Sequence, residues 1–209
     1  MPRLLLPHRG SPRPVGVRLA RALLIGVLAG AVVACGASIP KASFDPASAC
    51  TTDGRFPGAY PELEALLPPT FDGKTPTSVD SGRNCTPGGL GQLAKAGITG
   101  VRFAGSTWAL GGTSALTVAV FEGDGLDATN LLDFYEVGAR TARRTEKLNV
   151  GDTTVAGQAA RRLDVLGSDG TGQTIVTWPA DVPGRVNVLL AADLGDAKVA
   201  EALEAFGSR

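Results

Sequence analysis

The spacing of apolar residues predicts a pair of strands near the middle of the chain. Residues 114–121 are so rich in apolar side chains at both odd and even positions that a strand there would be buried on both faces. Residues 100–110 form a second extended stretch, and Gly111-Gly112 between the two is a typical hairpin junction. We therefore expect an antiparallel pair at this point.

Three further extended stretches follow in the second half of the chain. They cover residues 153–165, 173–178 and 186–192, and turn residues separate each from the next. Short connections of this kind join neighbouring antiparallel strands. The pattern predicts an antiparallel meander.

Helical spacing appears between the extended stretches and again at the end of the chain. Two short helices are expected at 60–67 and 90–97. A longer helix is expected to begin at Asp127, whose side chain can cap it, and a last helix is expected to run from a cap at Asp196 to a stop at Gly207. Each has an apolar face that needs a partner.

Together these elements predict an α+β fold. We expect an antiparallel sheet of about five to seven strands, with helices packed on one face. Residues 71–80 can also be aligned with residues 155–164, and one alternative is therefore that the domain is a duplicated β-β-α type unit.

The N-terminus differs from the rest of the chain in charge and hydropathy. Residues 1–21 carry five arginines and no acidic residue, and residues 22–34 are an uninterrupted run of apolar or small residues. Thirteen helical residues would cover about 20 Å, which is short of the roughly 30 Å of a bilayer core. A cleaved signal segment is therefore expected; the alternative is a membrane span over residues 22–39.

The end of this run, Ala31-Val32-Val33-Ala34-Cys35, resembles the lipobox of bacterial lipoprotein precursors. The resemblance implies that Cys35 is lipidated and becomes the first residue of the mature chain. It then divides the sequence into a signal peptide (1–34), a lipid-anchored flexible spacer (35–49) and one domain (50–209). It also implies a cell-envelope location, on the outer surface of the cytoplasmic membrane or the periplasmic side.

Removal of residues 1–34 changes the charge and the cysteine count. The remainder has fifteen basic and twenty acidic residues, a net charge of −5, which does not favour nucleic acid as a partner. Cys50 and Cys85 are then an even pair in an oxidising compartment and are expected to form a disulfide.

No catalytic motif is apparent. The single histidine, His8, lies in the segment expected to be removed, which excludes histidine-dependent catalysis in the mature chain. Glu122, Asp124 and Asp127 follow a strand and offer oxygen ligands for calcium, but turn and capping roles explain them better. We predict no metal and no cofactor.

Two sets of residues are candidates for ligand contact. Arg140, Arg143 and Arg144 form the main basic concentration and could contact an anion, the alternative being a solvated helix end. Trp108 and Trp178 could each stack on a flat ligand, although a tryptophan at a strand end more often packs in a core.

These observations favour a tethered extracytoplasmic binding or interaction domain. Its partners would be the membrane, through the lipid, and an envelope protein or small ligand of unknown identity. The alternative function is a histidine-free hydrolase or carbohydrate-active enzyme that uses paired carboxylates.

Overall fold

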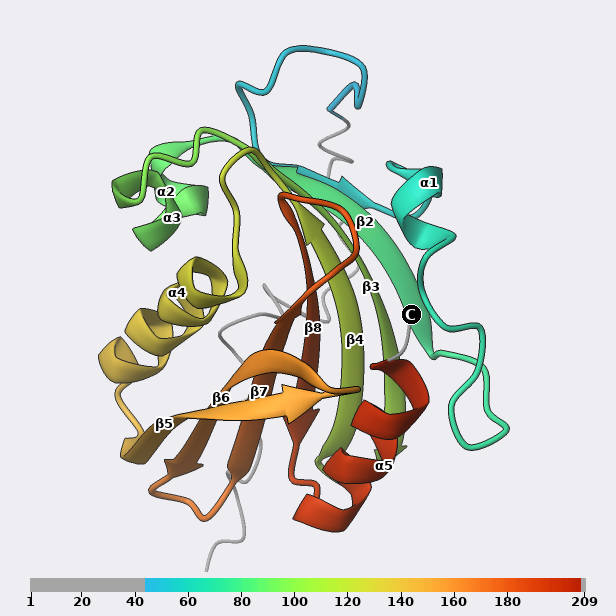
Figure 1. Cartoon of the computed structure of the whole chain (residues 1–209), viewed down its shortest axis with the longest axis vertical. Coiled ribbons are helices and arrows are strands. Elements are labelled where there is room, and N and C mark those ends of the chain that lie inside the picture. Colours follow the sequence, from blue (N-terminus) through green and yellow to red (C-terminus); the bar gives the residue numbers. More distant parts are fainter. Residues whose placement is uncertain (1–43, 208–209) are drawn as a thin grey trace, which may run out of the picture. The chain divides into compact units, whose positions relative to one another are not determined.

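Residues 44–207 are described by a computed structural model, and they form one antiparallel sheet with helices on both faces (Figure 1). Within this part the strands are β1 (Gly54–Phe56), β2 (Ser78–Asn84), β3 (Val101–Gly111), β4 (Ser114–Glu122), β5 (Thr145–Val155), β6 (Gln158–Gly167), β7 (Gly172–Pro179) and β8 (Arg185–Ala192). The helices are α1 (Pro61–Glu64), α2 (Pro87–Leu90), α3 (Gln92–Lys95), α4 (Ala128–Thr141) and α5 (Asp196–Phe206). The predicted α+β class is confirmed, but the eight strands exceed the five to seven expected.

The strands lie in the order β1-β2-β3-β4-β8-β7-β6-β5, and every neighbouring pair is antiparallel. The meander predicted for the second half corresponds to β6, β7 and β8 and is confirmed. The sheet is strongly twisted, so β4 and β5 run in clearly different directions in Figure 1. Its two edges are β1 and β5.

One of the additional strands, β5, arises from a hairpin where the sequence predicted one strand; β1 and β2 were also not among the predicted stretches. Residues 153–165 are divided between β5 and β6, because the chain reverses at Ala156 and Gly157, which have φ of 49° and 81°. Two consecutive positive φ values are the geometry of a tight hairpin turn. Glycine adopts this conformation readily, whereas alanine seldom does, so the turn was not evident from the sequence.

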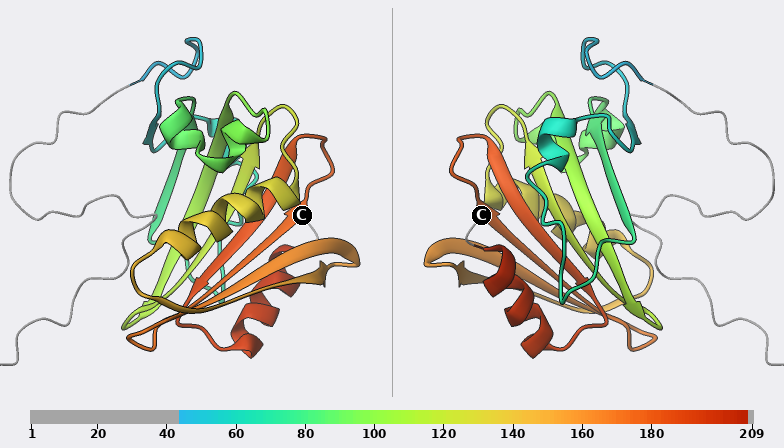
Figure 2. Two further views of the ribbon diagram at one scale, coloured as in Figure 1. Left: turned by 90° about the vertical axis from the view of Figure 1, so that its left-hand side faces the viewer. Right: turned by 90° about the vertical axis from the view of Figure 1, so that its right-hand side faces the viewer.

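The sheet has an apolar core on each face, contrary to the expectation that helices pack on one face. Ala119 and Phe121 of β4 face α4, whereas Leu116 and Val118 of the same strand face α5. We call these sides the α4 face and the α5 face. Figure 2 shows α4 in front of the sheet in one view and α5 with α1 in front in the opposite view. Strands rich in apolar residues at every position need cover on both sides, which explains the arrangement.

The strand order is symmetric about the central pair, β4 and β8, but the helices are not. A two-fold axis that exchanges the antiparallel strands β4 and β8 is perpendicular to the sheet. Rotation about this axis leaves each face of the sheet on the same side, so helices related by it would cover the same face. α4 and α5 follow corresponding strands but cover opposite faces. The positions of α4 and α5 therefore do not fit a domain built from two copies of one β-β-α unit.

The two long helices begin near the predicted residues. Asp127 caps α4, and its Oδ1 accepts a hydrogen bond from the Asn130 amide at 2.7 Å. For α5 the cap is Gly195, so the prediction of Asp196 was wrong by one position. The Asp196 carboxylate instead accepts a hydrogen bond from Arg162 at 2.6 Å.

Residues 44–49, which were assigned to the spacer, lie within the described part. Phe44 is 9% exposed and packs with Tyr60, Leu63 and other residues on the α5 face. The predicted disulfide between Cys50 and Cys85 is present and joins this N-terminal segment to the end of β2. The packed chain therefore extends at least to Phe44.

Candidate functional site

The most accessible bonding surface of the sheet is its long edge strand, β5. β5 has 11 residues, whereas β1 at the opposite edge has three. In the described part of the chain only β6 pairs with β5. Alternate residues of an antiparallel edge strand turn their N–H and C=O groups away from the neighbouring strand, so β5 presents a row of unpaired backbone groups.

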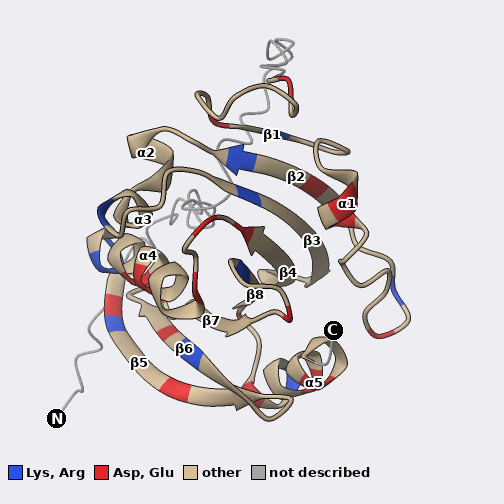
Figure 3. Ribbon diagram, turned by 45° about the horizontal axis from the view of Figure 1, so that its top comes forward, with Lys and Arg blue, Asp and Glu red and all other residues tan. Residues whose placement is uncertain are grey.

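The side chains of β5 alternate between the two faces. Leu148 and Val150 are half-buried and pack against the core beneath α4. Asp152 lies in the same row, directly opposite Arg161 of β6, with which it forms an ion pair at 3.1 Å. Lys147 and Asn149 point to the α5 face and are exposed. The edge therefore has one partly apolar side and one polar side. Charged positions along β5 are coloured on the ribbon in Figure 3.

A shallow groove of about 580 Å³ lies along the first half of this edge. Its lining combines charged, amide and apolar side chains, from Glu146, Lys147, Leu148, Asn149, Asp164, Val165 and Leu166. Both β5 and β6 contribute to it. The groove thus lies over the β5–β6 pair, next to the open edge that β5 forms.

A second groove, of about 470 Å³, lies between α5 and the β5–β6 hairpin. Arg162 is its charged centre; its Nε donates to Asp164 at 2.8 Å and its guanidinium also reaches Asp196. The hydrogen bonds that Arg162 donates to Asp164, and then to Asp196, raise its pKa against the opposing effect of burial. These contacts connect α5 to the sheet, so the arginine has a structural role.

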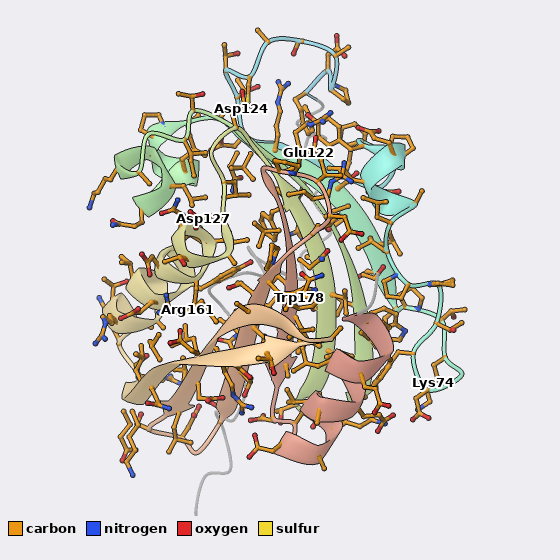
Figure 4. All side chains as sticks on the ribbon, in the orientation of Figure 1. Lys74, Glu122, Asp124, Asp127, Arg161 and Trp178 are labelled. Carbon is orange, nitrogen blue, oxygen red and sulfur yellow. A yellow bond between two sulfur atoms is a disulfide. The ribbon has the colours of Figure 1, made fainter. Side chains whose placement is uncertain are left out.

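The two tryptophans proposed as ligand contacts both lie in the core on the α5 face. Trp108 and Trp178 are each 1% exposed (Figure 4 shows Trp178 against the sheet). The Trp108 indole donates to the Lys74 carbonyl at 3.0 Å and stacks on Phe206. Stacking on a flat ligand needs an exposed ring face. The geometry of both tryptophans therefore fits core packing, the alternative given above, better than ligand contact.

The predicted basic cluster lies at the corner between α4 and β5. Arg140 pairs with Glu136 at 2.6 Å, and Arg144 lies 3.8 Å from Asp169. Arg143 is exposed. The structure thus brings this cluster next to the start of the open edge, where it lies beside Glu146 and Lys147 of the groove.

Glu122, Asp124 and Asp127 lie along the connection from β4 to α4, as labelled in Figure 4. Glu122 is held by guanidinium groups: Arg185 Nε donates to it at 2.9 Å, and Arg102 also bonds to it. Burial alone raises the pKa of Glu122, but the hydrogen bonds from Arg185 and Arg102 outweigh burial and hold it below its ordinary value. Glu122 and Asp127 therefore have structural partners.

One further carboxylate has an unusual environment. Burial raises the pKa of Asp80, and the nearby charge of Glu64 adds to this, although Arg55 opposes it through an ion pair at 2.9 Å. Glu64 itself accepts hydrogen bonds from the Ser81 hydroxyl and the Gly58 amide, each at 2.7 Å. Each carboxylate is thus engaged in contacts that connect α1 and β1 to β2.

The open edge was not predicted, because no strand was expected over residues 145–152. Most of these residues are charged or polar, so the alternation of apolar and polar side chains is seen only at Leu148 and Val150. The one usable signal was the run of β-branched residues from Thr153 to Val155, which has high strand propensity. Only pairing with β6 shows where the strand begins.

Cys35 and the predicted signal peptide, residues 1–34, lie outside the described residues. Among the helices of residues 44–207, none is long and apolar enough to cross a membrane. No model of a known protein family matches the chain, and no curated protein matches it either.

Proposed function

We propose that this chain is a lipid-anchored envelope protein whose domain binds an extended segment of a partner protein along β5. The observation that carries the proposal is the 11-residue open edge, with a groove beside it. Unpaired edge strands bind extended peptides by adding a strand, which satisfies the backbone groups of both chains. Such a domain needs no catalytic chemistry.

The anchor limits where the partner can be. Eight residues separate Cys35 from Phe44. At about 3.3–3.6 Å per residue they can span no more than about 29 Å. A lipid on Cys35 would therefore keep the domain close to the bilayer, and the partner would be exposed at the same membrane surface.

The anchor is tested by mass spectrometry and fractionation of cells that produce the chain. Cys35→Ala should release the protein from the membrane fraction, and Ser38→Ala, a nearby control, should leave it there. Wild-type protein should begin with a lipid-modified Cys35. Unmodified protein that retains residues 1–34 would contradict the anchor.

The binding surface is tested separately by photo-crosslinking in cells. A crosslinking amino acid at Asn149 on β5 should form an adduct with one defined partner segment. The same amino acid at Asp181, which is exposed in the loop between β7 and β8, should not. Equal adducts at both positions would contradict a β5 site.

A further inference from the structure

The side chains of β5 indicate which sequence its partner strand should have. We infer that β5 binds, in antiparallel orientation, a segment of a second protein that reads basic, bulky, apolar, polar, apolar, acidic from its N-terminus. The inference rests on the proposed function and specifies the chemistry of its partner.

The apolar positions follow from the α4 face. In an antiparallel pair, directly opposite residues point to the same face, with Cβ atoms about 4.5–5.5 Å apart. Residues opposite Val150 and Leu148 would extend the half-buried row that these side chains form with Leu163 and Val165. Apolar side chains there, two residues apart, would cover surface that β5 leaves partly exposed.

The charged positions follow from the two ends of the same stretch. The side chain of Asp152 is 91% exposed, although it forms an ion pair with Arg161. Its carboxylate can therefore accept a second cation. Lys147 is exposed five residues earlier on the other face. An antiparallel partner would therefore begin with a basic residue opposite Asp152 and end with an acidic one opposite Lys147.

The bulky position follows from Gly151. A Cβ added at this glycine would meet no atom within 4 Å, so the surface beside it is open. A large side chain opposite Gly151 can cover this space, in the way that aromatic residues cover glycines across a strand pair.

A second copy of this chain fits the edge poorly. A two-fold axis through an antiparallel pair must pass through a residue that faces its own copy. With the axis at Val150, Gly151 or Asp152, the carboxylate of Asp152 lies opposite Leu148, Val150 or itself. With the axis at Asn149, it lies opposite Glu146. Each of these four registers places a carboxylate against an apolar or a like-charged side chain, which is unfavourable. The charges therefore favour a different protein.

The inference is tested with a synthetic peptide, Lys-Tyr-Val-Thr-Ile-Glu, blocked at both ends, fluorescently labelled and titrated with the full chain in detergent micelles. Fluorescence anisotropy should show saturable binding. The control peptide, in which the first and last residues are exchanged, should bind more weakly. Equal binding of the two peptides, or no binding of either, would overturn the inference. This test is independent of the lipid anchor, because peptide binding by the domain does not require the lipid.

Charge-reversed variants locate the contact. Asp152→Lys should weaken binding about fivefold or more, because an attraction becomes a repulsion. Asp181→Lys, the same change in an exposed loop, should have no effect. A peptide that begins with Glu should recover affinity for Asp152→Lys. Equal effects of the two variants, or a stable dimer that Asp152→Lys alters in sedimentation, would contradict a heterologous partner at β5.

Discussion

At the scale of single residues, Arg83 of β2 organises the N-terminal part of the domain. Its side chain is buried, with the residue only 2% exposed. Its guanidinium donates to the Thr52 carbonyl at 3.0 Å and the Ser48 carbonyl at 2.9 Å, and it lies 4.5 Å from the centre of the Phe44 ring. Among residues 44–207 it forms no ion pair. Backbone carbonyls and an aromatic ring therefore balance the buried charge.

Removal of this side chain should destabilise the domain strongly. We expect Arg83→Ala to lower the free energy of unfolding by about 2–4 kcal/mol, because carbonyls of the N-terminal segment lose their donors and a void forms. Arg55→Ala, at an arginine that is 53% exposed, should cost less than about 1 kcal/mol. Urea unfolding measures both, and a smaller loss for Arg83→Ala than for Arg55→Ala would show that this assignment is wrong.

Glu122 should make stability depend on pH. Its pKa is lower in the folded chain than in the unfolded chain, so its contribution is fully present above the unfolded value of about 4.3 and is lost as pH falls through the lower folded value. Glu122→Gln should be less stable than wild type at pH 7, and the difference should shrink towards pH 3. Unfolding curves at several pH values test this; a difference that is independent of pH would contradict the proposed charge interaction.

At the scale of elements, the parts predicted from the sequence are those with strong local signals. The apolar spacing and the Asp127 cap located α4, and Gly111-Gly112 located the β3–β4 hairpin, where both glycines have positive φ. Residues 145–152 of β5 were missed because an edge strand is only partly buried and this part of the sequence is mostly polar. The role of Arg83 was missed because burial of a cation depends on contacts from residues more than 30 positions away. The open edge that forms the candidate site is therefore a property of the whole sheet.

The disulfide should stabilise the connection between the N-terminal segment and β2. Cys50 and Cys85 are 35 residues apart in the sequence, so the chain-entropy estimate is about 3–4 kcal/mol. The variant with both cysteines replaced by alanine should lose about this much in urea unfolding, and added reductant should reduce the stability of wild type only. An unchanged midpoint in the variant would contradict a stabilising role.

At the scale of the whole molecule, the architecture separates support from recognition. Two apolar cores and helices on both faces hold the centre of the sheet, whereas β5 lies at one side, and within residues 44–207 β6 is the only strand paired with it. The N-terminal segment, which would lead to the anchor, is fixed at the β1–β2 side of the sheet, and β5 is the opposite edge. An anchored domain of this form can present β5 to a partner without strain on the tether.

Hydrogen exchange of the β5 amides tests the central claim most directly. In the free protein we expect amides at alternate positions between residues 147 and 154 to exchange rapidly, because only β6 pairs with this strand in the described part of the chain. Addition of the peptide Lys-Tyr-Val-Thr-Ile-Glu should slow those amides and leave the already protected ones unchanged. If the peptide instead slowed amides elsewhere, or if all β5 amides were already protected in the free protein, the proposal that β5 is the binding edge would be contradicted.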